Sequence, residues 1–312
     1  MKRMHTDMML RRLFNYIEIR TKITSVLPFL MTLAYLALNH RTIDPLRSGV
    51  FFAGMILFDL TATTINNYND TKKNDLELPL PRRKALGITL LLLTMSLGCG
   101  LWLVALTDVL VLLAGALCFF FGIVYSWGPF PLSHGPFGEV ASGFFYGVMI
   151  PFILIRINDA GYLLTYGLTT EQISVHINIM PTVGFALLTV LPFCLTAGIM
   201  LANNICDAAH DVRVGRRTLV FYLQDRALPL FASLYYAAYL SMVIMVIFGF
   251  LPLLSLALLL TLIPVQRNLN IFRQKQSKEE TFSVSIRNFV LILSAHTALI
   301  FLSGLLPAWR LQ

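Results

Sequence analysis

Asn66-Asn67-Tyr68-Asn69-Asp70 and Asn203-Asn204-Ile205-Cys206-Asp207 are two versions of one polar pattern in a chain that is mainly apolar. Each version ends a long hydrophobic run, and each is followed by a further acid (Asp75 or Asp211) and then by basic residues. Ionisable groups are costly within a membrane and usually mark a functional site. The pair therefore predicts membrane-spanning helices that share a site for a cation or a charged ligand.

The composition supports a membrane protein that crosses the bilayer several times. The chain has 312 residues, of which 57% are hydrophobic and only 13% are charged, and its mean hydropathy is +0.73. A soluble domain carries about 25% charged residues. The net charge of +8 is explained by basic loops retained in the cytoplasm. We therefore expect the lipid bilayer, and not a nucleic acid, as the partner of the basic surface.

The expected fold is an all-α bundle of about nine transmembrane helices around a central cavity. A bilayer-spanning helix needs roughly 20 apolar residues, and the whole chain, 1–312, is predicted to form one domain. Residues 1–22 have an amphipathic pattern that indicates an interfacial helix on the cytoplasmic surface. The predicted spans are 23–39, 49–69, 85–106, 109–126, 138–156, 180–203, 228–248, 251–265 and 288–306.

The distribution of lysine and arginine predicts the orientation. With the N-terminus inside, 20 of the 24 Lys and Arg residues fall in cytoplasmic segments, as the positive-inside rule requires. The C-terminus is then outside, and the spans that carry the two motifs run in the same direction. Both motifs therefore reach the cytoplasmic face, unlike those of an inverted repeat. We expect a plasma-membrane protein whose site opens toward the cytoplasm.

Helical spacing gives each motif a row of oxygen ligands. Asn66 and Asp70 are four residues apart, as are Asn203, Asp207 and Asp211 in turn, so each set shares a helix face. Such oxygens suit Mg²⁺, which takes one or two carboxylates and completes its shell with water and phosphate oxygens. Nearby basic side chains would hold a diphosphate. The alternative is helix capping by ordinary interfacial polar residues. The candidate diphosphate ligands are Lys72, Lys73, Arg213 and Arg216.

Three blocks of sequence carry a resemblance to a known family. The run from Asn203 to Leu219, Tyr125-Ser126-Trp127-Gly128-Pro129 and Phe137-Gly138-Glu139 are similar to motifs of the UbiA superfamily of membrane prenyltransferases. Within it, the chain resembles the 1,4-dihydroxy-2-naphthoate polyprenyltransferases of menaquinone synthesis. The first motif departs from the family pattern, because Asn67 stands where an aspartate is usual and Asp75 is shifted by one position.

The resemblance implies Mg²⁺-dependent transfer of a polyprenyl group from a polyprenyl diphosphate to an aromatic acceptor. It implies metal binding by Asp70, Asp75, Asp207 and Asp211, with support from Asn66, Asn67 and Asn203. Asp70, Asp207 and Asp211 would act in catalysis together with Tyr125, which would face the cavity or else form part of an interfacial aromatic belt. The alternatives are another aromatic acceptor, such as 4-hydroxybenzoate or haem, a non-catalytic isoprenoid or quinone carrier, and a transporter. The oligomeric state is not predicted.

Other residues have two interpretations each. Arg20 and Lys22 could meet the carboxylate of an acidic acceptor, or could anchor the first span at the cytoplasmic surface. Glu139 could be catalytic or structural. The connection 267–287 is expected to be solvated. Six aromatic residues could line a prenyl tunnel or face lipid, namely Phe119, Phe120, Phe121, Phe144, Phe145 and Tyr146.

Overall fold

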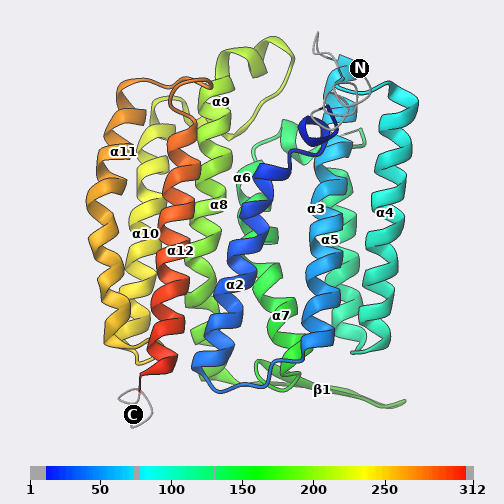
Figure 1. Ribbon diagram of the computed structural model, residues 1–312, viewed down its shortest axis with the longest axis vertical. Coiled ribbons are helices and arrows are strands. Elements are labelled where there is room, and N and C mark those ends of the chain that lie inside the picture. Colours follow the sequence, from blue (N-terminus) through cyan, green and yellow to red (C-terminus); the bar gives the residue numbers. More distant parts are fainter. Residues whose placement is uncertain (1–11, 74–77, 130, 307–312) are drawn as a thin grey trace, which may run out of the picture.

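The computed structural model describes residues 12–73, 78–129 and 131–306, and over these residues the protein is a bundle of long helices (Figure 1). Eight helical segments are long and apolar enough to cross a membrane, and Ile23–Leu38 is a shorter apolar helix. Each of the nine predicted spans corresponds to one of these segments. The helices are α2 (Ile23–Leu38), α3 (Pro45–Lys73), α4 (Arg82–Ala105), α5 (Val109–Ser126), α6 (Gly138–Phe144), α7 (Ile150–Asn158), α8 (Ile179–Arg213), α9 (Leu219–Leu223), α10 (Ala227–Ile247), α11 (Leu262–Gln274) and α12 (Ser283–Leu305).

Local sequence signals explain where several helices begin. Asp44 accepts hydrogen bonds from the backbone N–H groups of Leu46 and Arg47 at 2.9 and 3.0 Å, and Pro45 occupies the first position of α3. An acidic cap followed by proline is a strong helix start. Asp108 caps α5 in the same way. A π-helical turn, η3 (Phe145–Met149), joins α6 to α7, and a 3-10 segment, η5 (Leu253–Thr261), leads into α11.

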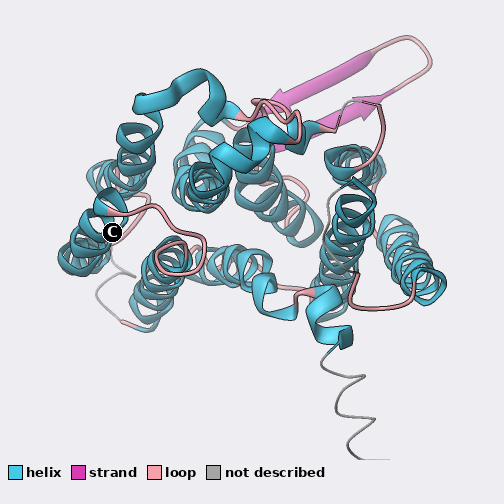
Figure 2. Ribbon diagram, turned by 90° about the horizontal axis from the view of Figure 1, so that it is seen from above, coloured by secondary structure: helices cyan, strands magenta, loops and turns pink. Residues whose placement is uncertain are grey.

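The helices form a ring that is seen from above in Figure 2. The first half of the chain meets the second where α12 packs against α2 and where α6 and η3 pack against α8. The contact of η3 with α8 is very close, because a Cβ atom on Gly147 of η3 would overlap the backbone of Phe193 and Pro192. Glycine at position 147 therefore lets the two halves meet.

Two of the helices that run past their predicted spans carry the motif aspartates in the extra length. We expected spans 49–69 and 180–203, but α3 begins at Pro45 and runs to Lys73, and α8 continues to Arg213. At 1.5 Å per residue the 35-residue α8 is about 52 Å long, whereas the hydrocarbon core of a bilayer is about 30 Å thick. The motifs at the ends of α3 and α8 therefore extend toward one end of the bundle, called here the motif end.

The opposite end carries a small β-hairpin, which the all-α expectation did not include. Strand β1 (Leu164–Leu168) pairs antiparallel with β2 (Ile173–Ile177), with Tyr166 opposite Val175. Arg156 fixes this end, since its guanidinium pairs with Asp108 at 2.7 Å and donates to the backbone oxygen of Leu164 at 2.8 Å. The hairpin thus lies at the far end of the bundle from the motifs (Figure 1).

The N-terminal segment inserts into the bundle. Residues 1–11 of the predicted interfacial helix lie outside the described residues. Tyr16, just before η1 (Ile19–Lys22), is fully buried, and its hydroxyl lies 2.9 Å from Thr89 Oγ1 and 3.1 Å from the backbone oxygen of Thr64. This side chain therefore connects the segment to α3 and α4, which is a closer attachment than an interfacial helix requires.

Candidate functional site

Arg216 brings the two motifs together. One guanidinium nitrogen, Nη2, lies 2.6 Å from Asp70 Oδ1 on α3, and the other, Nη1, lies 4.0 Å from Asp211 Oδ1 on α8. Asp211 is buried, and the side chains of Arg216 and Asp70 are 19% and 24% exposed. Carboxylates from the two halves of the chain therefore share one cation at the motif end.

The end of α8 explains why Arg216 points back over the site. Gly215 has a φ of +79°, a conformation that glycine adopts without the cost that a Cβ imposes. The N–H groups of Gly215 and Arg216 bond to the backbone oxygens of Val212 and Asp211 at 3.2 and 2.8 Å. This is the Schellman pattern of helix termination. The Asp-X-X-X-Gly-Arg order thus places the guanidinium beside the acid of its own motif.

A lysine from a distant loop contacts the second motif. Lys278 Nζ lies 2.5 Å from Asp207 Oδ2 and also bonds to Asn203 Oδ1. Asn203 donates to the same Asp207 oxygen at 3.3 Å. Lys278 belongs to the connection between α11 and α12. The expectation that residues 267–287 form a solvated connection is therefore corrected in two respects. All of 267–274 belongs to α11 and 283–287 belongs to α12, and Lys278 reaches the site.

The first motif is organised around Asn66. Its amide nitrogen donates to Asp70 Oδ2 at 3.2 Å, and its amide oxygen accepts from Ser126 Oγ at 2.9 Å. Asn69 donates to the backbone oxygen of Ser126 at 3.2 Å. Ser126 is the last residue of α5. These bonds attach the acid-bearing end of α3 to α5.

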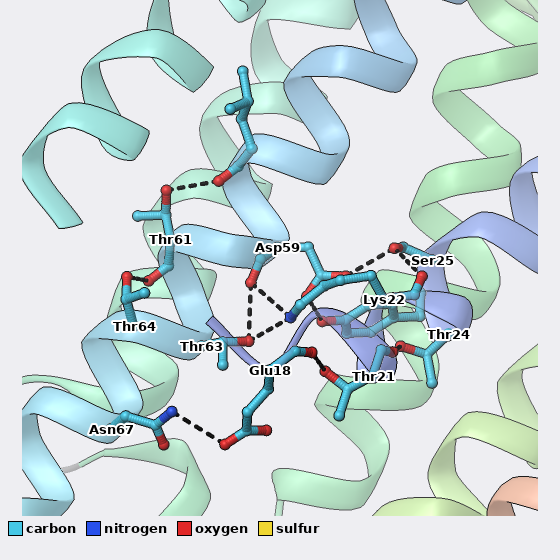
Figure 3. A network of polar contacts seen from close by, with 12 residues as sticks. Glu18, Thr21, Lys22, Thr24, Ser25, Asp59, Thr61, Thr63, Thr64 and Asn67 are labelled. Carbon is cyan, nitrogen blue, oxygen red and sulfur yellow. Dashed lines mark hydrogen bonds and ion pairs between the residues drawn. The ribbon is translucent and has the colours of Figure 1, made fainter. Parts of the chain in front are cut away.

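Asn67 has a different environment from the one we expected. Its amide nitrogen donates to Glu18 Oε1 at 3.1 Å (Figure 3) and to the backbone oxygen of Tyr16 at 3.0 Å. Both partners belong to the N-terminal segment. This geometry does not support a role for Asn67 in holding a metal beside Asp70.

The basic residues predicted to bind diphosphate do not all lie at the site. Arg213 is exposed, and its Nε donates to the backbone oxygen of Ala209 in its own helix at 3.2 Å. Lys72 and Lys73 are the last two residues of α3, and Asp75 lies outside the described residues. The roles of these last three residues therefore stay predictions, while Arg216 is the predicted basic residue that contacts the acids.

Asn204 and Glu139 form a buried pair between α8 and α6. Asn204 donates to Glu139 Oε1 at 2.8 Å, and both side chains are buried. Asn204 lies three residues before Asp207 in the second motif. Its amide instead joins the two halves of the bundle, which favours the structural interpretation of Glu139.

An apolar cavity of about 480 Å³ extends from the motif end into the bundle. Asn66, Ser126 and Tyr125 line it near the motifs, and Val50 and Val111 line its far end. From Asn66 to Val50, sixteen residues of α3 span about 24 Å. Of the two alternatives for Tyr125, the structure favours the cavity, and the hydroxyl of Tyr125 accepts a hydrogen bond from Ser142 Oγ at 3.3 Å. Of the candidate tunnel aromatics, the cavity is lined by Phe119, Phe121, Phe145 and Tyr146.

The motif end offers suitable donors for Mg²⁺. Among the described residues, no three Asp, Glu, His or Cys side chains converge closely enough to hold a metal ion. Mg²⁺ commonly takes only one or two carboxylates and fills its shell with water and substrate phosphates. Asp70, Asp207 and Asp211 fit that pattern, because their present partners are the side-chain cations of Arg216 and Lys278, whose places a metal ion could take.

A second charged cluster lies deeper in the bundle, and the sequence motifs did not indicate it (Figure 3). Lys22 and Asp59 form an ion pair at 2.8 Å, and both side chains are only 6% exposed. Asp59 also accepts from Ser25 and Tyr146, each at 2.8 Å. Lys22 is therefore not a surface anchor. The missed signal was an acid inside the apolar run of α3, where ionisable groups usually mark function.

The fold and the site together define a multi-pass membrane protein with acidic, amide and basic groups above an apolar cavity. The chain belongs to the UbiA prenyltransferase family, whose profile matches residues 25–304. The membership of a prenyltransferase family that the motifs indicate is thereby confirmed.

One curated relative has a partial match. The 1,4-dihydroxy-2-naphthoate octaprenyltransferase of Bacillus subtilis (strain 168) is 30% identical over 152 residues. This match covers 48% of the present chain and 42% of that relative, so it spans less than half the length of either protein.

Solved structures share the fold at low sequence identity. A UbiA homolog from Archaeoglobus fulgidus bound to GPP and Mg²⁺ has a TM-score of 0.61 at 14% identity, over 95% of this chain and 100% of that one. The apo structure of a UbiA homolog from Aeropyrum pernix K1 has a TM-score of 0.61 at 16% identity, over 86% and 96%.

Proposed function

We propose that the protein transfers a polyprenyl group from a polyprenyl diphosphate to an aromatic quinone precursor in a Mg²⁺-dependent reaction. The observation that carries the proposal is the position of the charged cluster of Asp70, Asp211, Arg216, Asp207 and Lys278 next to a long apolar cavity. A prenyl diphosphate matches this arrangement, because it has an anionic head for the charged cluster and an apolar tail for the cavity. The homolog from Archaeoglobus fulgidus bound to GPP and Mg²⁺ supports this choice of donor.

The residues of the charged cluster bind and orient the leaving group. Mg²⁺, when bound by Asp70, Asp207 and Asp211, supplies positive charge that stabilises the departing diphosphate. Arg216 and Lys278 are placed to exchange their carboxylate partners for phosphate oxygens, and arginine binds such oxygens in a bidentate manner. The C–O bond breaks with its electron pair remaining on the diphosphate. The charge that develops there is stabilised by groups already in position.

The cavity residues protect and direct the allylic carbon. Tyr125, Phe121 and Phe145 present aromatic side chains to the cavity, and aromatic faces stabilise cations. The apolar walls exclude water, which would otherwise capture the cation. An electron-rich aromatic carbon then forms the new C–C bond to the prenyl group. The relative from Bacillus subtilis suggests 1,4-dihydroxy-2-naphthoate as the acceptor. Carbon dioxide and diphosphate are then released, and the product is demethylmenaquinol, the hydroquinone form of demethylmenaquinone.

The protein is proposed to lie in the plasma membrane with its motif end in the cytoplasm, where soluble acceptors and diphosphates are available. The positive-inside distribution supports this orientation. A prenyltransferase with a different aromatic acceptor and a non-catalytic isoprenoid or quinone carrier are the competing functions.

One assay separates these functions. The purified full chain is incubated with Mg²⁺, a polyprenyl diphosphate and a panel of aromatic acceptors, and prenylated products are identified by mass spectrometry. We expect product with 1,4-dihydroxy-2-naphthoate and its loss in Asp70→Ala and Asp207→Ala. If product formed only with another acceptor, that compound would replace 1,4-dihydroxy-2-naphthoate as the proposed acceptor. Donor binding without any product would favour the carrier, and full activity in both variants would refute the proposed metal and diphosphate site.

A further inference from the structure

We propose that the buried Asp59 cluster, formed by Lys22, Ser25, Asp59, Thr63 and Tyr146, binds the aromatic acceptor through a hydroxyl group of its ring. This inference rests on the proposed prenyl transfer and specifies where, and by which chemical group, the acceptor is recognised. Figure 3 shows the cluster at the junction of α2 and α3. Tyr146 completes it from the π-helical turn η3.

The cluster forms a polar patch on the wall of the apolar cavity. Ser25, Asp59, Thr63 and Tyr146 all line the cavity, and the lysine lies behind them. Ligand pockets are mostly apolar and use a few convergent polar groups to orient the ligand. An aromatic ring with a polar substituent matches this combination better than a prenyl chain does.

The hydrogen bonds of the cluster leave it with spare acceptors rather than spare donors. Lys22 Nζ bonds to Asp59 Oδ1 at 2.8 Å, to the backbone oxygen of Asp59 at 3.2 Å and to Thr63 Oγ1 at 2.5 Å. A lysine ammonium has only three protons, so all of them are used. Tyr146 donates its hydroxyl proton to Asp59 Oδ1. The hydroxyl of Ser25 lies 2.8 Å from Asp59 Oδ2 and 2.9 Å from the backbone oxygen of Lys22, so its single proton is also used. The lone pairs on the hydroxyl oxygens of Tyr146 and Ser25 therefore call for a ligand that donates a hydrogen bond.

This pattern distinguishes a hydroxyl from a carboxylate. A carboxylate needs donors or an unpaired cation, whereas Lys22 is already paired and the Lys22–Asp59 pair has no net charge. A phenolic hydroxyl can donate its proton to the hydroxyl oxygen of Tyr146 or Ser25. These hydroxyls are themselves bonded to the ionised carboxylate of Asp59, and hydrogen bonds that involve an ionised group are stronger than neutral ones. Such a bond also raises the electron density of the ring, which favours its attack on an allylic carbon. The structure thus disfavours the sequence-based idea that Lys22 binds the acceptor's acid group.

The distance along α3 between Asp59 and the motif end leaves room for the aromatic acceptor between them. Asp59 precedes Asp70 by eleven residues, which is about three helical turns and ~16 Å, so both side chains leave the same face of α3. This length accommodates three things in succession: a diphosphate at the motif end, a gap of ~3–3.5 Å between the reacting atoms, and one aromatic ring. The acceptor would then lie between the prenyl carbon and Asp59.

The test uses variants that keep the Lys22–Asp59 pair intact. Tyr146→Phe and Ser25→Ala each remove one hydroxyl from the cluster, and Ser96→Ala is the matched control. Ser96 is buried and lines the same cavity, but its hydroxyl bonds to its own helix at Leu93. We expect a ~5- to 10-fold rise in the acceptor KM for the two cluster variants, with an unchanged donor KM. Ser96→Ala should change neither constant.

Acceptor analogues test the chemical class directly. We expect 1-naphthol to compete with the acceptor in the wild type and to lose this effect in Tyr146→Phe, and 1-methoxynaphthalene and 1-naphthoate to compete weakly. An unchanged acceptor KM in both cluster variants, or equal competition by 1-naphthoate and 1-naphthol, would overturn the inference.

The proposed function and this inference can fail separately. Absence of any prenylated aromatic product refutes the function alone. Binding of 1-naphthol, measured by calorimetry on wild type and Tyr146→Phe, then still tests the cluster: weaker binding by the variant supports the subsite, and equal binding overturns it.

Discussion

Replacing Arg216 with glutamine should lower prenyl transfer strongly, because this arginine is the contact between the two motifs. Its guanidinium lies 2.6 Å from Asp70 Oδ1 and 4.0 Å from Asp211 Oδ1. Hydrogen bonds to charged groups contribute about 1.5–3 kcal/mol. If that interaction passes to the diphosphate in the transition state, its loss lowers kcat/KM for the prenyl diphosphate roughly 10- to 150-fold, at ~1.36 kcal/mol for each factor of ten.

Arg213→Gln is the matched control, since it makes the same change of charge three residues away. Arg213 is exposed and bonds to the backbone oxygen of Ala209 in its own helix. Surface substitutions of this kind alter free energies by about 0.5 kcal/mol, so we expect a loss of about twofold. For each variant, kcat/KM for the prenyl diphosphate is obtained from initial rates of labelled prenyl transfer at a saturating concentration of the acceptor. Equal losses in the two variants would show that net charge, and not the contact of Arg216 with the motifs, matters, and an active Arg216→Gln would refute the reasoning.

Three further changes test the surroundings of the site. Lys278→Met leaves Asp207 without its lysine and should raise the KM for the prenyl diphosphate ~10-fold. The control Lys275→Met, which breaks an exposed ion pair with Glu280, should leave this KM unchanged. Steady-state kinetics measure both values. Gly215→Ala forces a Cβ into a positive φ and should lower the free energy of unfolding by about 1–2 kcal/mol, as thermal unfolding in detergent will show. Tyr16→Phe removes a buried hydroxyl and should cost about 1 kcal/mol of stability with unchanged kinetic constants.

The sequence predicts the bundle well because its signals are local. Apolar runs of bilayer length, with polar connections between them, locate every predicted span. The charge distribution places both motifs on one face, and the contact of Arg216 with Asp70 and Asp211 agrees with that placement. Helical spacing also pairs Asn66 correctly with Asp70.

Contacts between distant segments set the limits of the prediction. Lys278 lies 71 residues beyond Asp207 in a loop whose composition is typical of a solvated connection. Asn67 is close to the acid face by helical spacing, but the N-terminal segment binds its amide. Asp59 stands alone in an apolar run and matches no motif, so only the folded chain shows that Lys22 is its partner.

The second half of the chain compensates the charge of a first motif that has fewer acids than the family pattern. Three carboxylates, those of Asp70, Asp207 and Asp211, meet two cations, those of Arg216 and Lys278. Arg216 follows α8 but bonds to the acid of α3, so the second half of the chain supplies charge compensation to the first. With the carboxylates engaged by Mg²⁺, Arg216 and Lys278 would be available to pair with the phosphate oxygens of the donor. Because this exchange needs only one carboxylate from α3, Asp70 can serve the site even though Asn67 has turned toward the N-terminal segment.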